Sequence, residues 1–324
     1  LGSDRDALSD EELARQVAVT TIFARLTPDQ KTRVIRILRE AGHVVGYMGD
    51  GINDAAAMRT ADVGISVDSA VDIAKEAAAV ILLAKDLLVL EAGILEGRKT
   101  YANMIKYIKM TAASNFGNML SVLVAGAFLP FLPMTALQLL FLNMLYDISC
   151  VALPWDNIDQ EFLAYPKPWQ ATSISTFMLW LGPASSLFDI LTYLLMYFIV
   201  CPSFTGGLLF SQLTDPAQQV LYVSIFQTGW FIESMWSQTL VIHMLRTPKL
   251  PFVRSIASYP VILVTTFACL TVTVLPFLPF AFKAMGLGRI PLWYFPWLIF
   301  LIAGYLLLAT LVKNSYLRRY GELL

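Results

Sequence analysis

The sequence predicts an α/β part at the N-terminus, followed by an all-α membrane domain of six helices. The first hundred residues are rich in charge and alternate short apolar strands with helical patterns, which is typical of a parallel sheet. The remainder contains six apolar stretches close to the ~20 residues that a helix needs to cross a bilayer. The whole chain agrees with this mixture, since 57% of its residues are hydrophobic, 15% are charged and the mean hydropathy is +0.62.

Two helix starts are predicted in the α/β part. Ser9 and Glu12 have the spacing of a capping box, and Thr27 precedes Pro28, which suits the first position of a helix running to about Ala41. We expect strands over Thr20 to Arg25, His43 to Met48, Val63 to Val67 and Val80 to Leu83. In a sheet built this way, ligands bind beyond the carboxyl ends of the strands.

A Gly-rich turn, Gly49-Asp50-Gly51-Ile52-Asn53-Asp54, follows the strand that ends at Met48. Its place between a strand and a helix start favours phosphate, because backbone N–H groups and the helix dipole attract an anion there. Asp50 and Asp54 would repel a bare phosphate, so a divalent cation is needed between them. Mg²⁺ suits this role, since it binds one or two carboxylates, water and phosphate oxygens. The alternative is that both aspartates only shape the turn and cap the helix.

The six predicted spans are Asn103 to Phe128, Met134 to Leu153, Ser175 to Val200, Leu221 to Leu245, Tyr259 to Phe282 and Leu292 to Val312. Among the segments that follow the first span, most of the positive charge lies in the loop between the fourth and fifth spans and after the sixth, whereas residues 202–219 contain no Lys or Arg. By the positive-inside rule, we expect the α/β part and the C-terminus to be cytoplasmic. Lys283 and Arg289 are exceptions, because they lie in the loop between the fifth and sixth spans, which this orientation places outside.

Residues 86–128 contain no Pro and form one continuous helical pattern. We expect residues 86–102 to be a stalk that transmits movement of the α/β part to the first span; the alternative is a rigid tether. The predicted organisation is residues 1–85 for the α/β part, 103–313 for the membrane domain and 314–324 for a cytoplasmic tail.

Polar side chains within a membrane span indicate function, because burying them in lipid costs free energy and they are rare there without a role. Asn115 and Asn118 are three residues apart on the first span, and Asn143 and Asp147 are four apart on the second, so each pair shares a helix face. Their oxygen ligands suit a hard cation such as Mg²⁺ or Ca²⁺ rather than copper or zinc. Glu233, in the fourth span, completes this site or relays a proton. The alternative for the Asn residues is hydrogen bonding between helices.

Other polar residues are expected to be structural. Asp189 in the third span fits a buried acid with satisfied hydrogen bonds, and neither His43 nor His243 has a second His or Cys at ligand spacing. The three Cys residues are scattered and form neither a disulfide framework nor a metal motif. The net charge of -1 argues against a nucleic-acid partner.

The motif Gly-Asp-Gly-Ile-Asn-Asp at 49–54 resembles the hinge of the P-type transport ATPases, which have a haloacid-dehalogenase-like phosphorylation domain. The segments Phe23 to Lys31 and Ala61 to Val67 resemble the family's sequence on either side of that hinge, and the six spans resemble its membrane helices five to ten. The segments Met110 to Asn118, Leu142 to Trp155 and Trp230 to Thr247 are most similar to the bacterial magnesium-transporting subgroup.

The resemblance implies roles for the residues of the turn. Asp50 and Asp54 would hold the catalytic Mg²⁺, while the ammonium group of Lys31 would neutralise charge on a phosphoryl group derived from ATP. Gly49 and Gly51 would lie against the phosphate. Asn53 would contact it or orient Asp50. A lysine exposed to solvent on its helix is the alternative for Lys31.

In the similar calcium pumps, ligands occupy matching positions on the fifth and sixth membrane helices. Asn118 stands where those pumps have an acidic residue, so fewer carboxylates face the ion. That difference fits a single Mg²⁺ that keeps some of its water, because Mg²⁺ dehydrates reluctantly.

The chain also departs from the family pattern. Ala55-Ala56-Ala57-Met58 stands where the family has Ala-Pro-Ala-Leu, and neither Asp-Lys-Thr-Gly-Thr nor Thr-Gly-Glu occurs. The first of the missing motifs carries the phosphorylated Asp. We therefore expect the chain to be the C-terminal part of a larger pump, inactive alone, whose N-terminal remainder supplies the nucleotide domain and four membrane helices.

The function expected from this resemblance is ATP-driven import of a divalent cation, foremost Mg²⁺, through a multi-pass pump of the bacterial plasma membrane. One alternative is the same family with another cargo, namely Ca²⁺, a monovalent ion or lipid. The other is a membrane anchor or regulatory subunit without catalysis.

Overall fold

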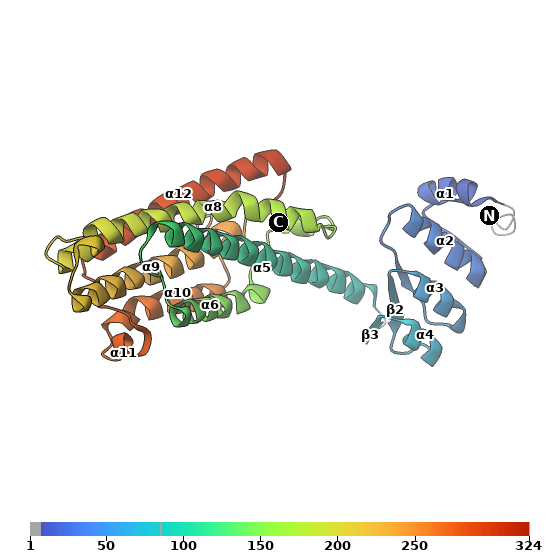
Figure 1. The fold of residues 1–324 in the computed structure, drawn as a ribbon. Helices are drawn as coiled ribbons and strands as arrows, with labels where there is room; N and C mark the ends of the chain where they lie inside the picture. The colour runs from blue at the N-terminus through green and yellow to red at the C-terminus, as the bar shows by residue number, and fades with distance from the viewer. Residues whose placement is uncertain (1–7, 85, 324) are drawn as a thin grey trace. The chain divides into compact units, whose positions relative to one another are not determined.

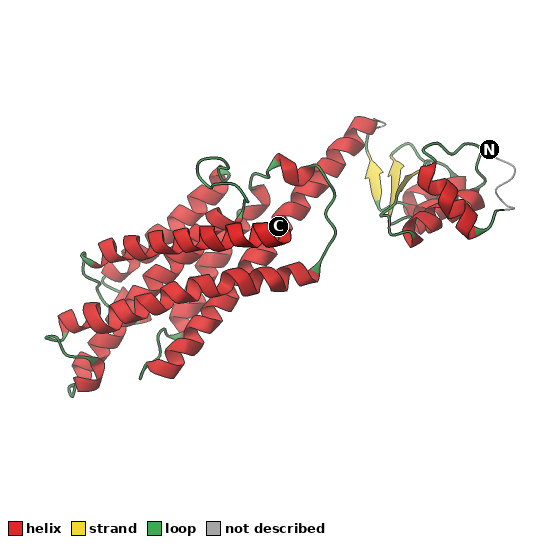
Figure 2. Cartoon of the chain, turned by 90° about the horizontal axis from the view of Figure 1, so that it is seen from above, coloured by secondary structure: helices red, strands yellow, loops and turns green. Residues whose placement is uncertain are grey.

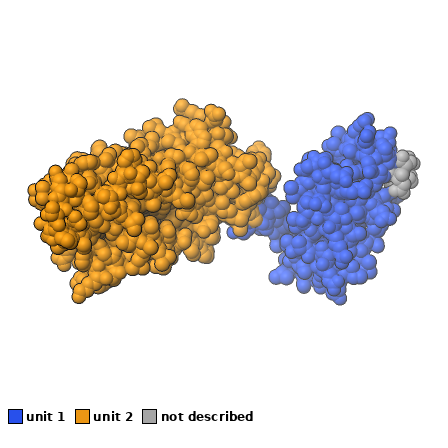
Figure 3. Space-filling model, viewed as in Figure 1, with its two compact units in different colours: residues 1–96 blue, residues 97–324 orange. Residues whose placement is uncertain are grey.

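The computed structural model describes residues 8–84 and 86–323 and divides the chain into two compact units, residues 1–96 and residues 97–324 (Figures 1 and 3). The first unit is α/β and the second is helical (Figure 2). Each unit has hydrophobic clusters of its own.

The first unit contains a parallel sheet of three strands in the order β1 (Gly46–Met48), β2 (Val63–Val67) and β3 (Val80–Leu82). Gly46 pairs with Val63, and Ile65 pairs with Val80. The three strands lie where the sequence predicts them, although β1 and β3 are shorter. This sheet places the Gly-rich turn directly after the carboxyl end of β1.

The predicted strand over Thr20 to Arg25 is wrong. Thr20 is instead the C-cap of the preceding helix: its N–H donates to Val17 O and its hydroxyl to Gln16 O. Arg25 has a φ of 56°, a left-handed conformation that a strand does not allow. Thr20 is β-branched and suits a strand by propensity alone, but here the need to cap a helix end decides its backbone.

The helices of the first unit are α1 (Asp10–Val19), α2 (Pro28–Glu40), α3 (Ala55–Thr60) and α4 (Asp72–Ala77). Both predicted helix starts are confirmed. Ser9 and Glu12 form a complete capping box, and Thr27 forms a second one with Gln30. The apolar face of α2 packs on α1, which holds α2 in place for the residues at its N-terminus.

The second unit contains the long helices of the chain (Figure 1). They are α5 (Leu87–Phe128), which begins within the first unit, α6 (Ala136–Val151), α8 (Ala171–Leu195), α9 (Pro216–Leu245), α10 (Tyr259–Val274) and α12 (Tyr294–Tyr320). Short helices α7 (Gln160–Leu163) and α11 (Ala281–Met285) lie in the connections. Helix α5 is uninterrupted because its sequence contains no Pro and no two adjacent Gly residues.

Four helical stretches among the described residues are long and apolar enough to cross a membrane: Ala136–Trp155, Ala171–Phe204, Tyr259–Phe277 and Tyr294–Tyr320. The other two predicted spans lie on α5 and α9, which carry more polar residues. The polar side chains of α9 are largely buried, because this helix packs against α6, α8, α10 and α12. The six-helix count stays a prediction.

Helices α5 and α8 approach each other through glycine. A Cβ atom on Gly117 would lie 2.8 Å from Gly182 O and 2.2 Å from Ser185 Oγ, so only glycine fits there. Ser186 Oγ donates to Gly117 O at 2.8 Å across the same contact. This close approach holds the polar residues of α5 against the interior of the bundle.

Candidate functional site

The Gly-rich turn is anchored to the sheet by backbone atoms. Gly49 N donates to Ile65 O at 3.0 Å, Gly49 O accepts from Ser66 Oγ at 2.9 Å, and Asp50 O accepts from Val71 N at 3.2 Å. Each of these partners belongs to β2 or the segment after it. The turn therefore has a defined position at the carboxyl edge of the sheet, where ligands of such sheets bind.

The first glycine of the turn leaves room for Asp54. A Cβ atom at Gly49 would lie 2.4 Å from the Cβ atom of Asp54 and 3.1 Å from its Oδ2. Asp54 lies in the 3₁₀ turn Ile52–Asp54, whose Asp54 N donates to Gly51 O. The turn thus folds back on itself and brings the carboxylate of Asp54 over Gly49.

Asp54 is the centre of a polar cluster from three elements. Its Oδ1 accepts hydrogen bonds from Lys31 Nζ on α2 at 2.7 Å and from Tyr47 OH on β1 at 2.8 Å. Lys31 reaches this point because the capping box at Thr27 starts α2 beside the turn. The structure therefore brings together Lys31 and Asp54, two residues that the sequence singles out.

The cluster shifts the pKa of each of its members. Burial alone would raise the pKa of Asp54, but the hydrogen bonds from Lys31 and Tyr47 lower it below its ordinary value. The hydrogen bond to Asp54 raises the pKa of Lys31, and burial together with the same carboxylate raises that of Tyr47. All three shifts favour a charged Lys31–Asp54 pair next to a neutral tyrosine.

Tyr47 is a site residue that the sequence reasoning missed. It lies two residues before Gly49 on a strand, where it reads as an ordinary half-buried aromatic residue. Only the pairing of β1 with its neighbours and the position of α2 show that its hydroxyl reaches Asp54.

Asp50 and Asn53 are exposed at the open edge of the turn. Neither side chain forms a hydrogen bond or ion pair with another described residue. A cavity of about 270 Å³ lies beside Asp50 and is lined by Met48, Gly49, Asp50, Val67, Leu82, Asp86 and Leu87. Asp50 is thus available to a ligand, whereas one oxygen of Asp54 is already engaged by Lys31.

The donor set of the turn fits Mg²⁺ in the presence of phosphate. Asp54 Oδ1 is occupied, but its Oδ2 lies against Gly49 and Gly51, and Asp50 is uncommitted. The described residues contain no group of three or more His, Cys, Asp or Glu side chains that could hold a metal by themselves. Mg²⁺ bound through one or two carboxylates needs phosphate and water for its remaining ligands, which is its usual mode.

The predicted cation ligands in the membrane unit have different surroundings. Asn118 Oδ1 accepts a hydrogen bond from Gln238 Nε2 on α9 at 3.1 Å. Asn115, Asn143 and Asp147 are exposed on the unit, and among the described residues no hydrogen bond joins them to one another or to Asn118. Gln238 is an additional polar residue that the sequence reasoning missed.

Glu233 lies in the interior of the bundle, and no hydrogen bond among the described residues joins it to the other predicted ligands. It is fully buried, and the carboxyl group beside it is that of Asp189 on α8. Asp189 accepts from Ser121 Oγ at 2.6 Å and from Trp230 Nε1 at 2.7 Å, as a satisfied buried acid should. No spacing pattern indicates the pairing of Asp189 with Glu233, since they lie on different helices.

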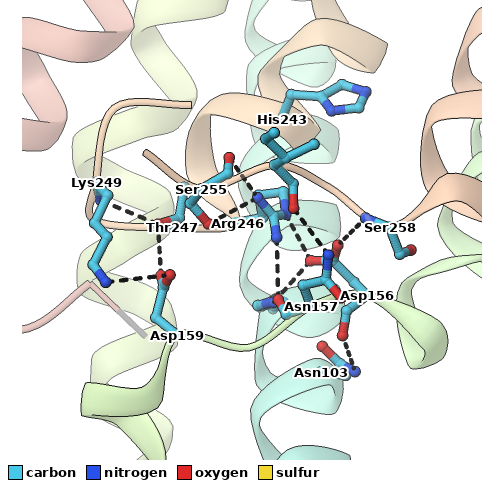
Figure 4. Close-up of polar contacts among 12 residues, drawn as sticks. Asn103, Asp156, Asn157, Asp159, His243, Arg246, Thr247, Lys249, Ser255 and Ser258 are labelled. Carbon is cyan, nitrogen blue, oxygen red and sulfur yellow. Dashed lines mark hydrogen bonds and ion pairs between the residues drawn. The ribbon is translucent and has the colours of Figure 1, made fainter. Parts of the chain in front are cut away.

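A second polar cluster surrounds the segment that follows α6 (Figure 4). Asp156 has a fully buried side chain and accepts from Lys106 Nζ at 2.8 Å, Arg246 Nε at 2.7 Å and Ser258 N at 3.1 Å. Burial alone would raise the pKa of Asp156, but the two cations lower it. One carboxylate thus joins α5 to the end of α9 and the start of α10.

The same cluster binds the loop through backbone atoms. Lys106 and Arg246 both donate to Asn157 O, and Asn103 Nδ2 donates to Pro154 O at 2.9 Å. At its rim, Lys249 pairs with Glu161 at 2.9 Å. The loop after α6 is therefore fixed to α5 by Asn103 and Lys106 and to the end of α9 by Arg246.

Comparison with known proteins identifies the family. A family model described as "Cation transporting ATPase, C-terminus" matches residues 131–315, more than half of the chain. The chain belongs to this family. The predicted resemblance to P-type transport ATPases is confirmed.

The relatives of this ATPase chain include bacterial pumps. It is 53% identical over 321 residues to "Magnesium-transporting ATPase, P-type 1" of Escherichia coli (strain K12) and 51% identical to the protein of that name in Salmonella typhimurium, in each case over 99% of this chain and 34% of the relative. It is 36% identical to "Calcium-transporting ATPase" of Bacillus subtilis (strain 168), over 50% of this chain and 18% of that protein. The chain thus spans about a third of the length of the magnesium-transporting relatives.

The four apolar helices and the bacterial relatives together make this ATPase chain a multi-pass protein of the bacterial inner membrane. The matched region begins after α5, covers the helices from α6 to α11 and ends within α12. It contains Asp156 and Arg246 of the buried cluster, whose Lys106 lies outside it on α5, as well as the pair of Asp189 and Glu233.

Proposed function

We propose that this chain is part of a P-type pump that uses ATP to move a divalent cation, foremost Mg²⁺, into the bacterial cytoplasm. The observation that carries the proposal is the 51–53% identity to magnesium-transporting ATPases over 99% of the chain. The relatives are about three times as long, so a further part of the pump supplies the nucleotide site and the phosphorylated Asp.

The first unit acts as the C-terminal part of a haloacid-dehalogenase-like phosphorylation domain. Asp50 and Asp54 hold the catalytic Mg²⁺, which supplies charge neutralisation at the phosphoryl group. Lys31 adds a positive charge in the same place, and its contact with Asp54 at 2.7 Å supports this role. The backbone of Gly49 and Gly51, together with Asn53, offers hydrogen-bond donors to phosphate oxygens.

The second unit carries the path of the transported cation. Asn115, Asn118, Asn143 and Asp147 offer oxygen ligands from α5 and α6, and three of them remain uncommitted among the described hydrogen bonds. We place six membrane-spanning helices in this unit, with the first unit and the C-terminus in the cytoplasm, in line with the positive charge after α9 and α12. Because α5 continues from the first unit, it is the element that passes movement to the membrane site.

The test is ATPase activity of the full-length pump in liposomes, with free Mg²⁺, Ca²⁺, K⁺ and Zn²⁺ varied while Mg·ATP is constant. We expect stimulation by free Mg²⁺ and its loss in Asp147→Asn, because the amide lacks the charge that compensates the ion. Asp215→Asn, an exposed position at the start of α9, is the control. Stimulation by another ion would overturn the cargo, and unchanged stimulation in Asp147→Asn would remove that residue from the site.

The same preparation tests the catalytic assignment. Asp50→Asn should abolish turnover of the phosphoenzyme, since it removes an uncommitted carboxylate from the Mg²⁺ site while leaving the backbone anchors of the turn intact. ATPase activity equal to that of the unmodified pump would contradict the role of Asp50.

A calcium pump is the second candidate function. It is favoured by the 36% identity over half the chain to a calcium-transporting ATPase, and stimulation of the ATPase activity by free Ca²⁺ would select it.

A further inference from the structure

Two acidic side chains meet inside the helical bundle. Asp189 on α8 is 3% exposed, and each of its carboxylate oxygens accepts a strong hydrogen bond, Oδ2 from Ser121 Oγ at 2.6 Å and Oδ1 from Trp230 Nε1 at 2.7 Å. Two donors aimed at one carboxylate stabilise its charged form. Asp189 is therefore arranged as a charged acceptor with both oxygens in use.

Glu233 on α9 is arranged in the opposite way. It is 0% exposed, and neither of its oxygens has a donor among the described residues. Its carboxyl lies beside that of Asp189 and near the hydroxyls of Thr192 and Ser237. Ser237 donates to a backbone carbonyl, while the hydroxyl of Thr192 is itself buried without a partner. A fully buried carboxylate without any donor would be strongly unfavourable.

The groups around the pair provide no compensating positive charge. The titratable groups facing it are tyrosines: Tyr193 on α8, and Tyr294 and Tyr305 on α12. In the described part of the chain no Lys, Arg or His lies within ion-pair distance of Asp189 or Glu233, and no third acidic, His or Cys side chain joins them as a metal ligand set. Two adjacent carboxylates in such surroundings cannot both be charged.

We propose that Asp189 and Glu233 form a proton-binding site in the membrane unit. One proton resides on a Glu233 oxygen and is donated in a hydrogen bond to the Asp189 carboxylate. This gives a hydrogen-bond partner to one of the two unpartnered oxygens of Glu233 and removes one of two like charges. On release, the O–H bond of Glu233 breaks, the electron pair stays on the carboxylate and the proton passes to water; on binding, the reverse occurs. The ligand is a proton, not the metal cation assigned to Asn115, Asn118, Asn143 and Asp147.

The site is connected to α5 by Ser121. Its hydroxyl donates to Asp189 and lies one turn from Gly117, where α5 and α8 are in contact. A displacement of α5 would remove this donor, destabilise the charged carboxylate and change the number of protons that the pair holds. This last step rests on the proposed function, in which α5 moves during the transport cycle; the proton site itself does not.

The experiment is infrared spectroscopy of the purified full-length pump in lipid nanodiscs at neutral pH, without ATP. We expect the carbonyl stretching band of a protonated carboxylic acid, which disappears in Glu233→Gln and persists in Asp215→Asn. The amide of the Gln side chain donates to Asp189 as the acid does, so this variant should fold. If it does not, ¹³C labelling of glutamate carboxyl groups in the unmodified pump must shift the band. Absence of the band, its persistence in Glu233→Gln or its insensitivity to labelling would overturn the proposal.

A second pair of variants tests the connection to α5. Ser121→Ala removes a donor to Asp189 and should shift the frequency of the Glu233 band, because the acceptor of its hydrogen bond changes. Ser114→Ala, at another buried serine of α5, should leave the band in place. Equal spectra for both variants would refute the link through Ser121. Because no step needs ATP or cargo, these results are independent of whether the pump transports Mg²⁺.

Discussion

The buried cluster at Asp156 makes a strong prediction about stability. Asp156→Asn keeps the size of the side chain but removes the charge that compensates Lys106 and Arg246, whose side chains are only 2% and 1% exposed. Removing one partner of a buried ion pair leaves an uncompensated charge and costs about 3–5 kcal/mol. With two cations affected, we expect a loss at the upper end of this range.

The measurement is reversible unfolding of the full-length pump by SDS in mixed micelles, followed by tryptophan fluorescence. Glu161→Gln in the same loop is the control, because its pair with Lys249 is exposed and should contribute nothing measurable. The double variant Asp156→Asn, Lys106→Met should recover part of the loss, since it removes one of the two orphaned cations. A loss for Asp156→Asn below about 1 kcal/mol, or no recovery in the double variant, would refute the reasoning.

Three further predictions follow from single positions. Gly49→Ala places a Cβ atom 2.4 Å from the Cβ atom of Asp54. The rate of phosphoenzyme turnover in rapid-quench assays should therefore fall at least tenfold, which corresponds to an activation free energy higher by about 1.4 kcal/mol. Asp62 accepts a hydrogen bond from Val45 N, which lowers the pKa of its carboxyl group. A lowered pKa in the folded state stabilises the fold above the ordinary pKa of about 3.9, and this stabilisation is lost as the pH falls through the folded-state pKa. In Asp62→Asn, the free energy of unfolding should therefore depend less steeply on pH in the acid range, as measured by unfolding at a series of pH values. Gly117→Ala should destabilise the helical unit by about 1–3 kcal/mol in thermal unfolding, whereas Gly126→Ala, with open space around it, should not.

Local features of this fold could be predicted from the sequence. The capping boxes at Ser9 and Thr27 and the strand Val63–Val67 depend on residues close together in the chain, and all three occur as expected. The long α5 follows from its lack of Pro. The prediction of a strand over residues 20–25 was wrong for a local reason too. Thr20 has a high β propensity, but it caps the end of α1 and takes its backbone conformation from that role.

The polar clusters could be predicted only in part. Lys31 and Asp54 were found because each lies in a recognisable motif, and the structure joins them at 2.7 Å. Asp156 and Arg246 are 90 residues apart on different elements, and their pairing depends on how α6, α9 and α10 pack. Contacts of this kind arise from tertiary packing, so no periodicity in the sequence encodes them.

Within the helical unit, α5 is held by polar contacts at different depths. Lys106 binds Asp156 in the loop after α6, Asn118 accepts from α9, and Ser121 donates to Asp189 on α8. Lys106 and Ser121 are 15 residues apart, which is about 22 Å along a helix. Each buried donor or acceptor left unpaired costs about 1–3 kcal/mol, so sliding or rotating α5 alone would break several such bonds at once. A moving α5 must therefore either carry all of these partners with it, Asp189 on α8 included, or exchange them in one discrete step, and the proton held beside Asp189 would respond only to the second.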